Sequence, residues 1–196
     1  MTFDAVVLAG GRSERLGGRP KAQLVFDGST LLERTLKAVQ DARQIVIVGD
    51  PGSSTVPITT IVTCEVPRFG GPVPALAGGL VAATGAVSEW VLLLACDMPH
   101  VVNAIPGLLS HRAGDGVLAR DDDGRDQYLL ACYRRAALLD AVDAHSGALA
   151  GMSMRALVGT LDTTVIDIPA GSARDVDTWD DAADFDILPN TGALHD

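Results

Sequence analysis

A glycine-rich, basic loop that directly follows the first apolar segment is the feature that most restricts how this chain can fold. Residues 5–8, AVVL, have the composition of a buried strand. The run LAGGRSERLGGRPK over residues 8–21, here called the glycine loop, holds four glycines, three arginines and one lysine against a single glutamate. Glycines let a backbone turn sharply or approach a ligand, and N–H groups together with Arg and Lys suit a polyphosphate. Because open α/β sheets bind ligands beyond the carboxyl ends of their strands, this position favours a phosphate-binding loop over a solvated loop with accidental basic residues.

Two common phosphate-binding motifs are absent from the glycine loop. No G-x-G-x-x-G sequence follows the first strand, which disfavours a nicotinamide dehydrogenase with the usual dinucleotide fold. Lys21 is preceded by Pro20, so the loop does not have the G-x-x-x-x-G-K-[ST] form of a P-loop either. The loop therefore indicates phosphate binding of another kind.

Apolar segments of two periodicities alternate along the rest of the chain. Short runs rich in Val, Ile and Leu predict strands, and apolar residues at helical spacing predict helices between them. The predicted strands lie at residues 1–8, 44–48, 58–62, 90–95, 117–120, 127–133 and 164–168, and the predicted helices at 31–41, 75–83, 104–111, 136–144 and 152–158, with a short one after 177. This alternation predicts an α/β, Rossmann-like fold, with a mostly parallel sheet and helices on both faces. We expect a single domain over residues 1–186 and a loose tail over residues 187–196.

Composition restricts the partners and the compartment. The chain has 196 residues and a formal net charge of −10, which disfavours binding to nucleic acid or to an anionic membrane surface. The sequence contains no apolar stretch long enough to span a membrane and no signal peptide. Cys64, Cys96 and Cys132 form no C-x-x-C pair, so we expect buried, reduced thiols in a cytoplasmic protein.

Asp97 follows the most apolar of the predicted strands, at 90–95. A carboxylate at the carboxyl end of a central parallel strand is placed to hold Mg²⁺, which bridges phosphate groups. The same residue suits an Asx turn or a helix cap, and its position alone leaves both interpretations open. Gly78 and Gly79, inside the helix at 75–83, also have two interpretations. They allow either close packing of the helix or approach of the backbone to a ligand.

The glycine loop resembles the signature loop of the MobA-like nucleotidyltransferases, and its LAGG start resembles the guanylyltransferase form within that family. Other motifs agree with this resemblance. Cys-Asp-Met-Pro at 96–99 is similar to the family's Cys-Asp-x-Pro, and the segment at 71–76 is similar to its Gly-Pro-x-x-Gly/Ala-Leu. Residues 175–181 resemble its Asp-x-Asn/Asp-Thr-Pro-x-Asp. The resemblance covers residues 6–181.

The resemblance implies a role for particular residues. It implies nucleotide contacts from Leu8, Ala9, Gly10, Gly11, Lys21, Glu65 and Asp97. The resemblance also implies catalytic roles for Arg15, Lys21 and Asp97, and it implies Asp97 and Asp177 as the ligands of a Mg²⁺ cofactor. Without the resemblance, Asp177 equally suits the N-cap of the short helix that follows it. Arg125 is implied to meet the phosphate of the acceptor substrate.

The implied reaction joins GMP from GTP to the terminal phosphate of molybdopterin, in the molybdenum cofactor, and releases pyrophosphate. The acceptor phosphate is largely ionised at neutral pH, so it can attack the α-phosphorus without a general base from the protein. Alignment and charge neutralisation then supply the catalysis. The resemblance also implies transient contact with molybdoenzymes or their chaperones, which receive the finished cofactor.

Three departures from the family pattern keep a different class of function open. Val66 stands where the family has an aspartate that contacts the nucleotide, and prolines are replaced by Tyr128 and Trp179. These changes are compatible with a nucleotide-binding regulatory protein that has lost turnover. The retained Lys21 and Asp97 argue against that reading.

The choice of GTP over CTP depends on one residue. The related cytidylyltransferases begin this loop with Leu-Ala-Ala-Gly, whereas Gly10 is found here. A molybdopterin cytidylyltransferase, or another small-molecule nucleotidyltransferase, is therefore the alternative.

Overall fold

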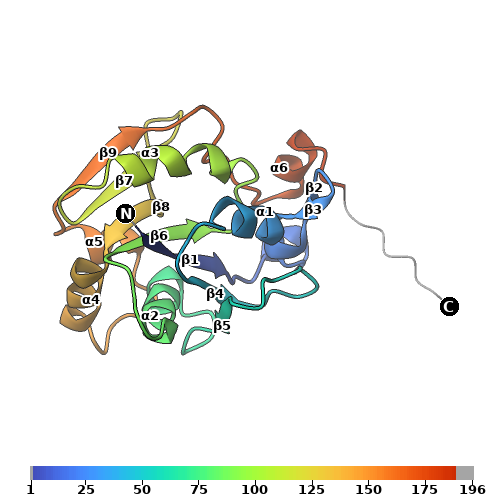
Figure 1. The fold of residues 1–196 in the computed structure, drawn as a ribbon. Helices are drawn as coiled ribbons and strands as arrows, with labels where there is room; N and C mark the ends of the chain where they lie inside the picture. Colours follow the sequence, from blue (N-terminus) through green and yellow to red (C-terminus); the bar gives the residue numbers. More distant parts are fainter. Residues whose placement is uncertain (1, 189–196) are drawn as a thin grey trace.

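A seven-stranded sheet forms the centre of the structure, a computed structural model that describes residues 2–188 (Figure 1). Within this sheet every strand except β8 runs in the same direction, because β8 pairs antiparallel with both its neighbours and the other pairings in the sheet are parallel. Across the sheet the strands are β5 (Ile61–Thr63), β4 (Ile45–Gly49), β1 (Phe3–Ala9), β6 (Trp90–Ala95), β8 (Asp126–Arg134), β7 (Gly116–Arg120) and β9 (Thr163–Asp167). The predicted α/β fold with a mostly parallel sheet is confirmed.

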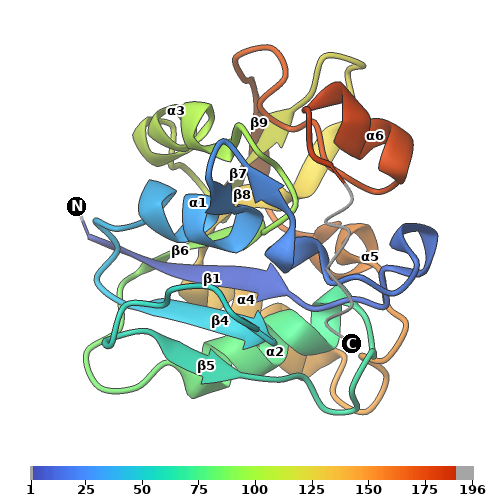
Figure 2. The ribbon, with the colours of Figure 1, turned by 90° about the vertical axis from the view of Figure 1, so that its right-hand side faces the viewer.

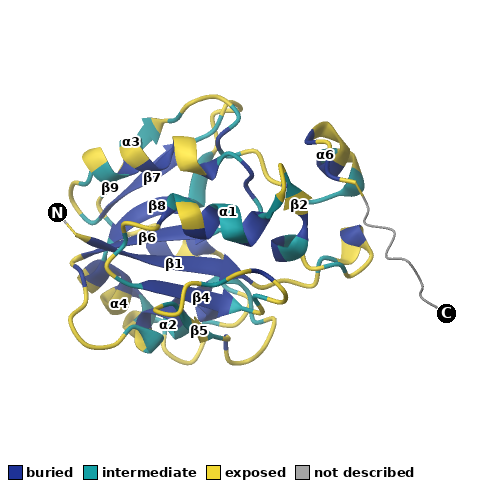
Figure 3. Cartoon of the chain, turned by 45° about the vertical axis from the view of Figure 1, so that its right-hand side comes forward, coloured by how far each residue is buried: buried dark blue, intermediate teal, exposed yellow. Residues whose placement is uncertain are grey.

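Helices cover both faces of the sheet, as predicted (Figure 1). Successive side chains of β1 point to opposite faces, so that Val7 belongs to one hydrophobic core and Val6 to the other. The first face is covered by α1 (Leu31–Ala38) and α3 (Ile105–Ser110), and the second by α2 (Pro72–Ala82), α4 (Arg135–Ala144) and α5 (Met154–Val158). Figure 3 shows that the central strands are buried between these layers. Within residues 2–188, none of the helices combines the length and the apolar composition needed to cross a membrane.

A third, smaller hydrophobic cluster lies beyond the carboxyl ends of β1 and β6 (Figures 1 and 2). It joins Leu16 of the glycine loop to Val176 and Phe185, which come from the last part of the described chain. It also takes in Leu24, Leu31 at the start of α1 and Ala182 of α6 (Trp179–Asp184), and Phe26 packs against it. Leu16 belongs to the 3-10 helix η1 (Glu14–Leu16), Leu24 follows the 3-10 helix η2 (Lys21–Gln23), and Phe26 belongs to the hairpin of β2 (Val25–Phe26) and β3 (Ser29–Thr30). Segments from the two ends of the described chain therefore meet beside the glycine loop.

The two glycines of α2 have different surroundings. A Cβ on Gly79 would lie 2.7 Å from Val6 Cγ1 and 3.0 Å from Val48 Cγ2, so glycine is needed for α2 to pack this closely on β1 and β4. A Cβ on Gly78 would make only ordinary contacts, the nearest being 3.7 Å from the carbonyl oxygen of Cys64. Close helix packing thus accounts for Gly79.

The structure corrects three predictions from the sequence. The strand predicted over 58–62 starts later, in β5, because Ile58 lies fully exposed in a turn. Cys64 is exposed, since it follows the edge strand β5, whereas the other two cysteines are buried as predicted. The predicted tail at 187–196 lies mostly outside the described residues. Its first residue, Ile187, is only 2% exposed and packs in the third hydrophobic cluster, so the packed chain reaches at least that far.

Candidate active site

A cavity of about 360 Å³, here called the first cavity, opens at the carboxyl ends of β1, β5 and β6. Its walls come from the glycine loop, from the segment after β5, from the start of α2 and from the end of β6. The residues predicted to bind the nucleotide all line it, namely Leu8, Ala9, Gly10, Gly11, Lys21, Glu65 and Asp97. Open α/β sheets bind ligands at this position, where the strand order changes direction beside β1.

Local backbone geometry shapes the glycine loop around the first cavity. Gly11 has a φ of 137°, a conformation that residues with a Cβ rarely adopt. Its N–H and that of Arg12 donate to no protein acceptor within residues 2–188, so both are available to a ligand. Leu16, which is 2% exposed, anchors the middle of the loop in the third hydrophobic cluster. Lys21 begins η2 at the end of the loop, and its side chain lines the cavity.

Lys21 is held between two carboxylates. Its Nζ lies 2.8 Å from Asp97 Oδ2 and also donates to Asp177 Oδ1, 156 positions further along the chain. Partial burial acts to lower the pKa of Lys21. The charge of Asp97 and the hydrogen bonds with both carboxylates outweigh this effect, so the pKa of Lys21 lies above its usual value. Lys21 is therefore a permanent cation at neutral pH.

Asp175, for which the sequence predicts no role, forms a group of three carboxylates with Asp97 and Asp177. One oxygen of each lies within 4.8 Å of the others, and we call this group the carboxylate cluster. The pKa of Asp175 is raised, because the protein shields its carboxyl from water and the like charges of Asp97 and Asp177 lie nearby, although the residue as a whole is exposed. Three oxygen donors at this spacing fit a hard divalent cation such as Mg²⁺. A sequence signal for Asp175 exists, since residues two apart in an extended segment point the same way.

Thr178, rather than Asp177, caps helix α6. Thr178 Oγ1 accepts the Asp181 N–H at 3.1 Å, and Asp181 Oδ2 accepts the Thr178 N–H at 2.7 Å, which completes a capping box. The helix-cap interpretation of Asp177 is therefore wrong. Its carboxylate is left to Lys21 and to Arg15, whose Nη1 lies 3.8 Å away. Arg15 is 75% exposed and does not line the first cavity, so it approaches the carboxylate from the solvent side.

A second cavity, of about 530 Å³, adjoins the carboxylate cluster at the ends of β7 and β9. Arg125 and the three consecutive aspartates of the preceding turn line it, together with Asp175 and Asp177. Arg125 forms an exposed ion pair with Asp123, at 3.4 Å. Arg125 and Asp177 thus both line the second cavity. Asp177 also contacts Lys21, which lines the first cavity, so the two cavities lie next to each other.

Cys96 lies at the end of β6, beside Asp97, but it does not suit nucleophilic chemistry. The residue is 4% exposed, and burial, followed by the charge of Asp97, raises the pKa of its thiol. The thiol therefore stays protonated at neutral pH. The reactive groups at the carboxyl ends of these strands are therefore the charged side chains around Lys21.

Comparisons with known proteins show the family and the fold that this chain resembles. The family model of the MobA-like NTP transferase domain matches residues 5–164. A protein of Mycobacterium marinum named "Probable molybdenum cofactor guanylyltransferase" is 37% identical over 168 residues, which are 83% of this chain and 82% of that protein. The solved structure of molybdopterin-guanine dinucleotide biosynthesis protein A from Archaeoglobus fulgidus is similar with a TM-score of 0.65, at 18% identity over 93% of this chain and 96% of that one. The 2-C-methyl-D-erythritol 4-phosphate cytidylyltransferase of Francisella tularensis gives a TM-score of 0.72, at 15% identity over 95% and 99% of the two chains.

These findings bear on fold and family in different ways. At 18% and 15% identity, the two solved structures support the fold alone. The family match includes the glycine loop, Glu65 and Asp97, and therefore every element that lines the first cavity. The relative from M. marinum extends the agreement to most of the chain. The chain belongs to the MobA-like NTP transferase family.

Proposed function

We propose that the protein is a molybdenum cofactor guanylyltransferase, which transfers GMP from GTP to the terminal phosphate of molybdopterin and releases pyrophosphate. The observation that most supports this is the first cavity, where the glycine loop, Lys21 and Asp97 meet. Over 168 residues, the chain is 37% identical to a relative named "Probable molybdenum cofactor guanylyltransferase". The LAGG start of the glycine loop favours GTP as the nucleotide.

The glycine loop would bind the triphosphate of GTP. The free N–H groups of Gly11 and Arg12 are donors for phosphate oxygens. Lys21 would exchange its carboxylate partners for phosphate oxygens and offset charge on the α-phosphate and on the leaving pyrophosphate. The chain has a net charge of −10, so this local positive charge is what lets an anionic nucleotide approach.

The carboxylate cluster would hold Mg²⁺. The family resemblance implies Asp97 and Asp177 as ligands, and the distances between oxygens add Asp175. A cation bound there would neutralise charge on the phosphate oxygens of the nucleotide. Asp97 lines the first cavity, and Asp175 and Asp177 line the second, so the charge would act where nucleotide and acceptor meet.

The second cavity would receive the acceptor, with its phosphate near Arg125. The ionised acceptor phosphate attacks the α-phosphorus of GTP, and the bond from that phosphorus to the pyrophosphate breaks. No proton has to be removed from the attacking oxygen, so the protein needs no general base. The residues of the two cavities would act by alignment and by charge neutralisation.

We place this reaction in the cytoplasm, with transient contact to molybdoenzymes or their chaperones. All three cysteines are free thiols, which suits a reducing compartment. Handover of the finished cofactor is an expectation from the family alone. The net negative charge offers no support for partners such as nucleic acid or an anionic membrane.

The first test is the thermal midpoint of the protein with GTP, CTP, ATP or NAD, each with and without Mg²⁺. A ligand at a hundred times its Kd adds about 2.7 kcal/mol to the free energy of unfolding, which gives a clear shift. The second test is release of pyrophosphate from GTP or CTP, with and without molybdopterin. Asp97→Asn serves as the matched inactive variant in both tests.

A Mg²⁺-dependent shift with GTP, together with molybdopterin-dependent release of pyrophosphate from GTP, would support the proposal. The same two results with CTP in place of GTP would overturn it in favour of a cytidylyltransferase. Nucleotide binding without any release of pyrophosphate would overturn it in favour of a binding protein that has lost turnover.

A further inference from the structure

Strand β8 is irregular where it passes the two cavities. It lies between β6 and β7 in the sheet (Figure 1), and its residue Ala131 pairs with Leu118 of β7. The next residue of β7, Ala119, pairs with Gln127, four positions earlier in β8. Residues 128–130 therefore have no partner within the described strand β7, and we call them the β8 bulge. Bulges are frequent beside active sites, where they redirect side chains.

The β8 bulge changes the faces to which the side chains of this strand point. Side chains of a regular strand alternate between the two faces of a sheet. Tyr128 and Leu129 are consecutive, yet both pack against the core on the α2 side. Gln127 pairs with Ala119 of the opposite core, whereas regular alternation from Ala131 would turn it to the α2 side. Leu129 thus lines the first cavity, and Gln127 lines the second.

Tyr133 supports the β8 bulge from the interior. Its side chain is fully buried, and its hydroxyl donates to the carbonyl oxygen of Tyr128 at 3.1 Å. Burial raises the pKa of Tyr133, so the hydroxyl stays protonated and remains a donor. Strand β7 leaves space for the ring, since a Cβ on Gly116 would lie only 2.8 Å from Tyr133 Cδ1. The bulge lacks partners in β7, so this hydrogen bond replaces part of the missing support.

We propose that Tyr133 is a positioning residue that aligns the acceptor with the nucleotide by holding the β8 bulge, an inference that rests on the proposed function. Leu129 would pack against the nucleotide in the first cavity, and Gln127 would contact the acceptor in the second. Both belong to one short stretch of backbone, so a movement of the bulge shifts one substrate relative to the other. Attack on the α-phosphorus requires alignment, and a misplacement of about 1 Å can cost about a hundred-fold in rate.

Steady-state kinetics of pyrophosphate release by Tyr133→Phe, with GTP and molybdopterin, test this. The substitution removes the hydroxyl and keeps the ring. A hydrogen bond between neutral groups is worth about two- to twelve-fold in an equilibrium constant, so we expect kcat to fall by about five-fold. The KM for GTP should stay within about two-fold of the wild-type value, because the glycine loop and Lys21 bind the triphosphate.

Thr35→Val is the matched control. It removes another buried hydroxyl, which donates to the carbonyl oxygen of Leu31 at 3.0 Å within α1. This change should leave kcat unchanged even where it lowers the thermal midpoint. An equal fall in kcat for Thr35→Val would overturn the inference, because a general loss of stability would then explain the effect of Tyr133→Phe.

A second pair of variants tests whether Tyr133 acts through the bulge. Leu129→Ala should lower kcat by itself, because the bulge then no longer contacts the nucleotide. Tyr133→Phe added to Leu129→Ala should have a smaller effect than it has in the wild-type protein, since two changes in one chain of contacts are not additive. Equal effects in the two backgrounds would overturn the inference.

A folded Tyr133→Phe protein with the wild-type kcat would also overturn it. If Tyr133→Phe folds poorly, Leu129→Ala decides the matter, since an unchanged kcat in that variant would mean that the bulge aligns no substrate. The proposed function fails separately, through a wild-type protein that releases no pyrophosphate from GTP with molybdopterin.

Discussion

Replacing Lys21 with methionine should let a divalent cation bind the carboxylate cluster in the absence of nucleotide. The ammonium group of Lys21 bonds to Asp97 and Asp177, which are two of the three proposed Mg²⁺ ligands. A cation must therefore compete with Lys21 for the same oxygens. Methionine is also unbranched and adapts to its surroundings, so the substitution removes the charge with little change in packing.

The contacts of Lys21 set the size of the expected effect. A hydrogen bond to a charged group contributes about 1.5–3 kcal/mol, and an incoming cation has to break at least one of them. Cation binding should then be about 10- to 150-fold weaker in the wild-type protein than in Lys21→Met. The lower part of this range is the expectation, because the Asp177 side chain is 42% exposed and water screens its contact with Lys21.

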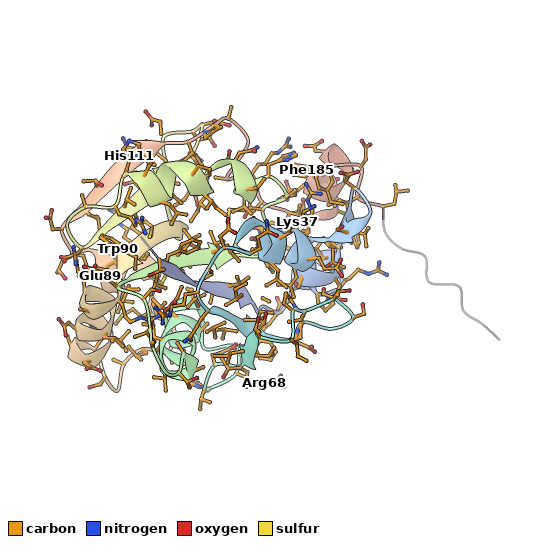
Figure 4. The ribbon with its side chains drawn as sticks, viewed as in Figure 1. Lys37, Arg68, Glu89, Trp90, His111 and Phe185 are labelled. Atoms are coloured by element: carbon orange, nitrogen blue, oxygen red, sulfur yellow. The ribbon has the colours of Figure 1, made fainter. Side chains whose placement is uncertain are left out.

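Electron paramagnetic resonance of free Mn²⁺, used as a probe for Mg²⁺, measures this affinity directly. We expect a Kd about ten-fold lower for Lys21→Met than for the wild-type protein. The control is Lys37→Met, which changes an exposed lysine on α1 and should have no effect (Figure 4). A non-hydrolysable GTP analogue should tighten Mn²⁺ binding to the wild-type protein, since its phosphates draw Lys21 away from the carboxylates. Equal Mn²⁺ affinities of folded Lys21→Met and wild-type protein would refute the reasoning.

Three further changes test other features. Asp97→Asn should lower molybdopterin-dependent pyrophosphate release by about a hundred-fold or more while cooperative unfolding persists, and a near-normal rate would exclude its proposed role. Asp175→Asn should stabilise the protein at pH 7 by up to about 1 kcal/mol, measured as a higher thermal midpoint. The reason is that the folded-state pKa of Asp175 is raised. Its carboxyl group therefore contributes to the free energy of unfolding below the unfolded-state pKa of 3.8, and this contribution is lost as the pH rises through the folded-state pKa. The gain should vanish in melts below pH 3.8, and a gain that persists there would rule out this cause. Gly79→Ala should destabilise by about 1–3 kcal/mol in urea unfolding, because its methyl group would clash with Val6, whereas Gly78→Ala should be neutral or stabilising. Equal unfolding midpoints for the two glycine variants would contradict the close packing of α2.

The local parts of the site can be predicted from the sequence. The glycine loop and Asp97 each follow an apolar strand, and the rule that ligands bind at the carboxyl ends of parallel strands locates both. The fold class follows in the same way, because strand and helix periodicities alternate along the chain. The strands predicted at 117–120 and 127–133 are found as β7 and β8, which pair with each other.

The long-range parts cannot be predicted in this way. The alternation of Asp175 and Asp177 places them on one side of their segment, but they lie near Asp97 because the chain after the edge strand β9 returns to the end of β6, where the Val176 N–H donates to the Asp97 carbonyl oxygen at 3.0 Å. No local pattern encodes that return. The exposure of Cys64 is also a long-range effect, because a residue after an edge strand lacks the neighbour that would bury it. The burial of Glu65 likewise depends on the loop that follows it, where the Phe69 N–H donates to its carboxylate.

The pairing of Lys21 with Asp177 also has a consequence for how the protein is made. A growing chain emerges from the ribosome amino end first. The sheet can be complete once β9 has emerged, at Asp167, but Lys21 then still lacks one of its carboxylate partners. Leu16 gains Val176 and Phe185 as packing partners only after that point. Chains that stop shortly after β9 should therefore retain the sheet without a closed site.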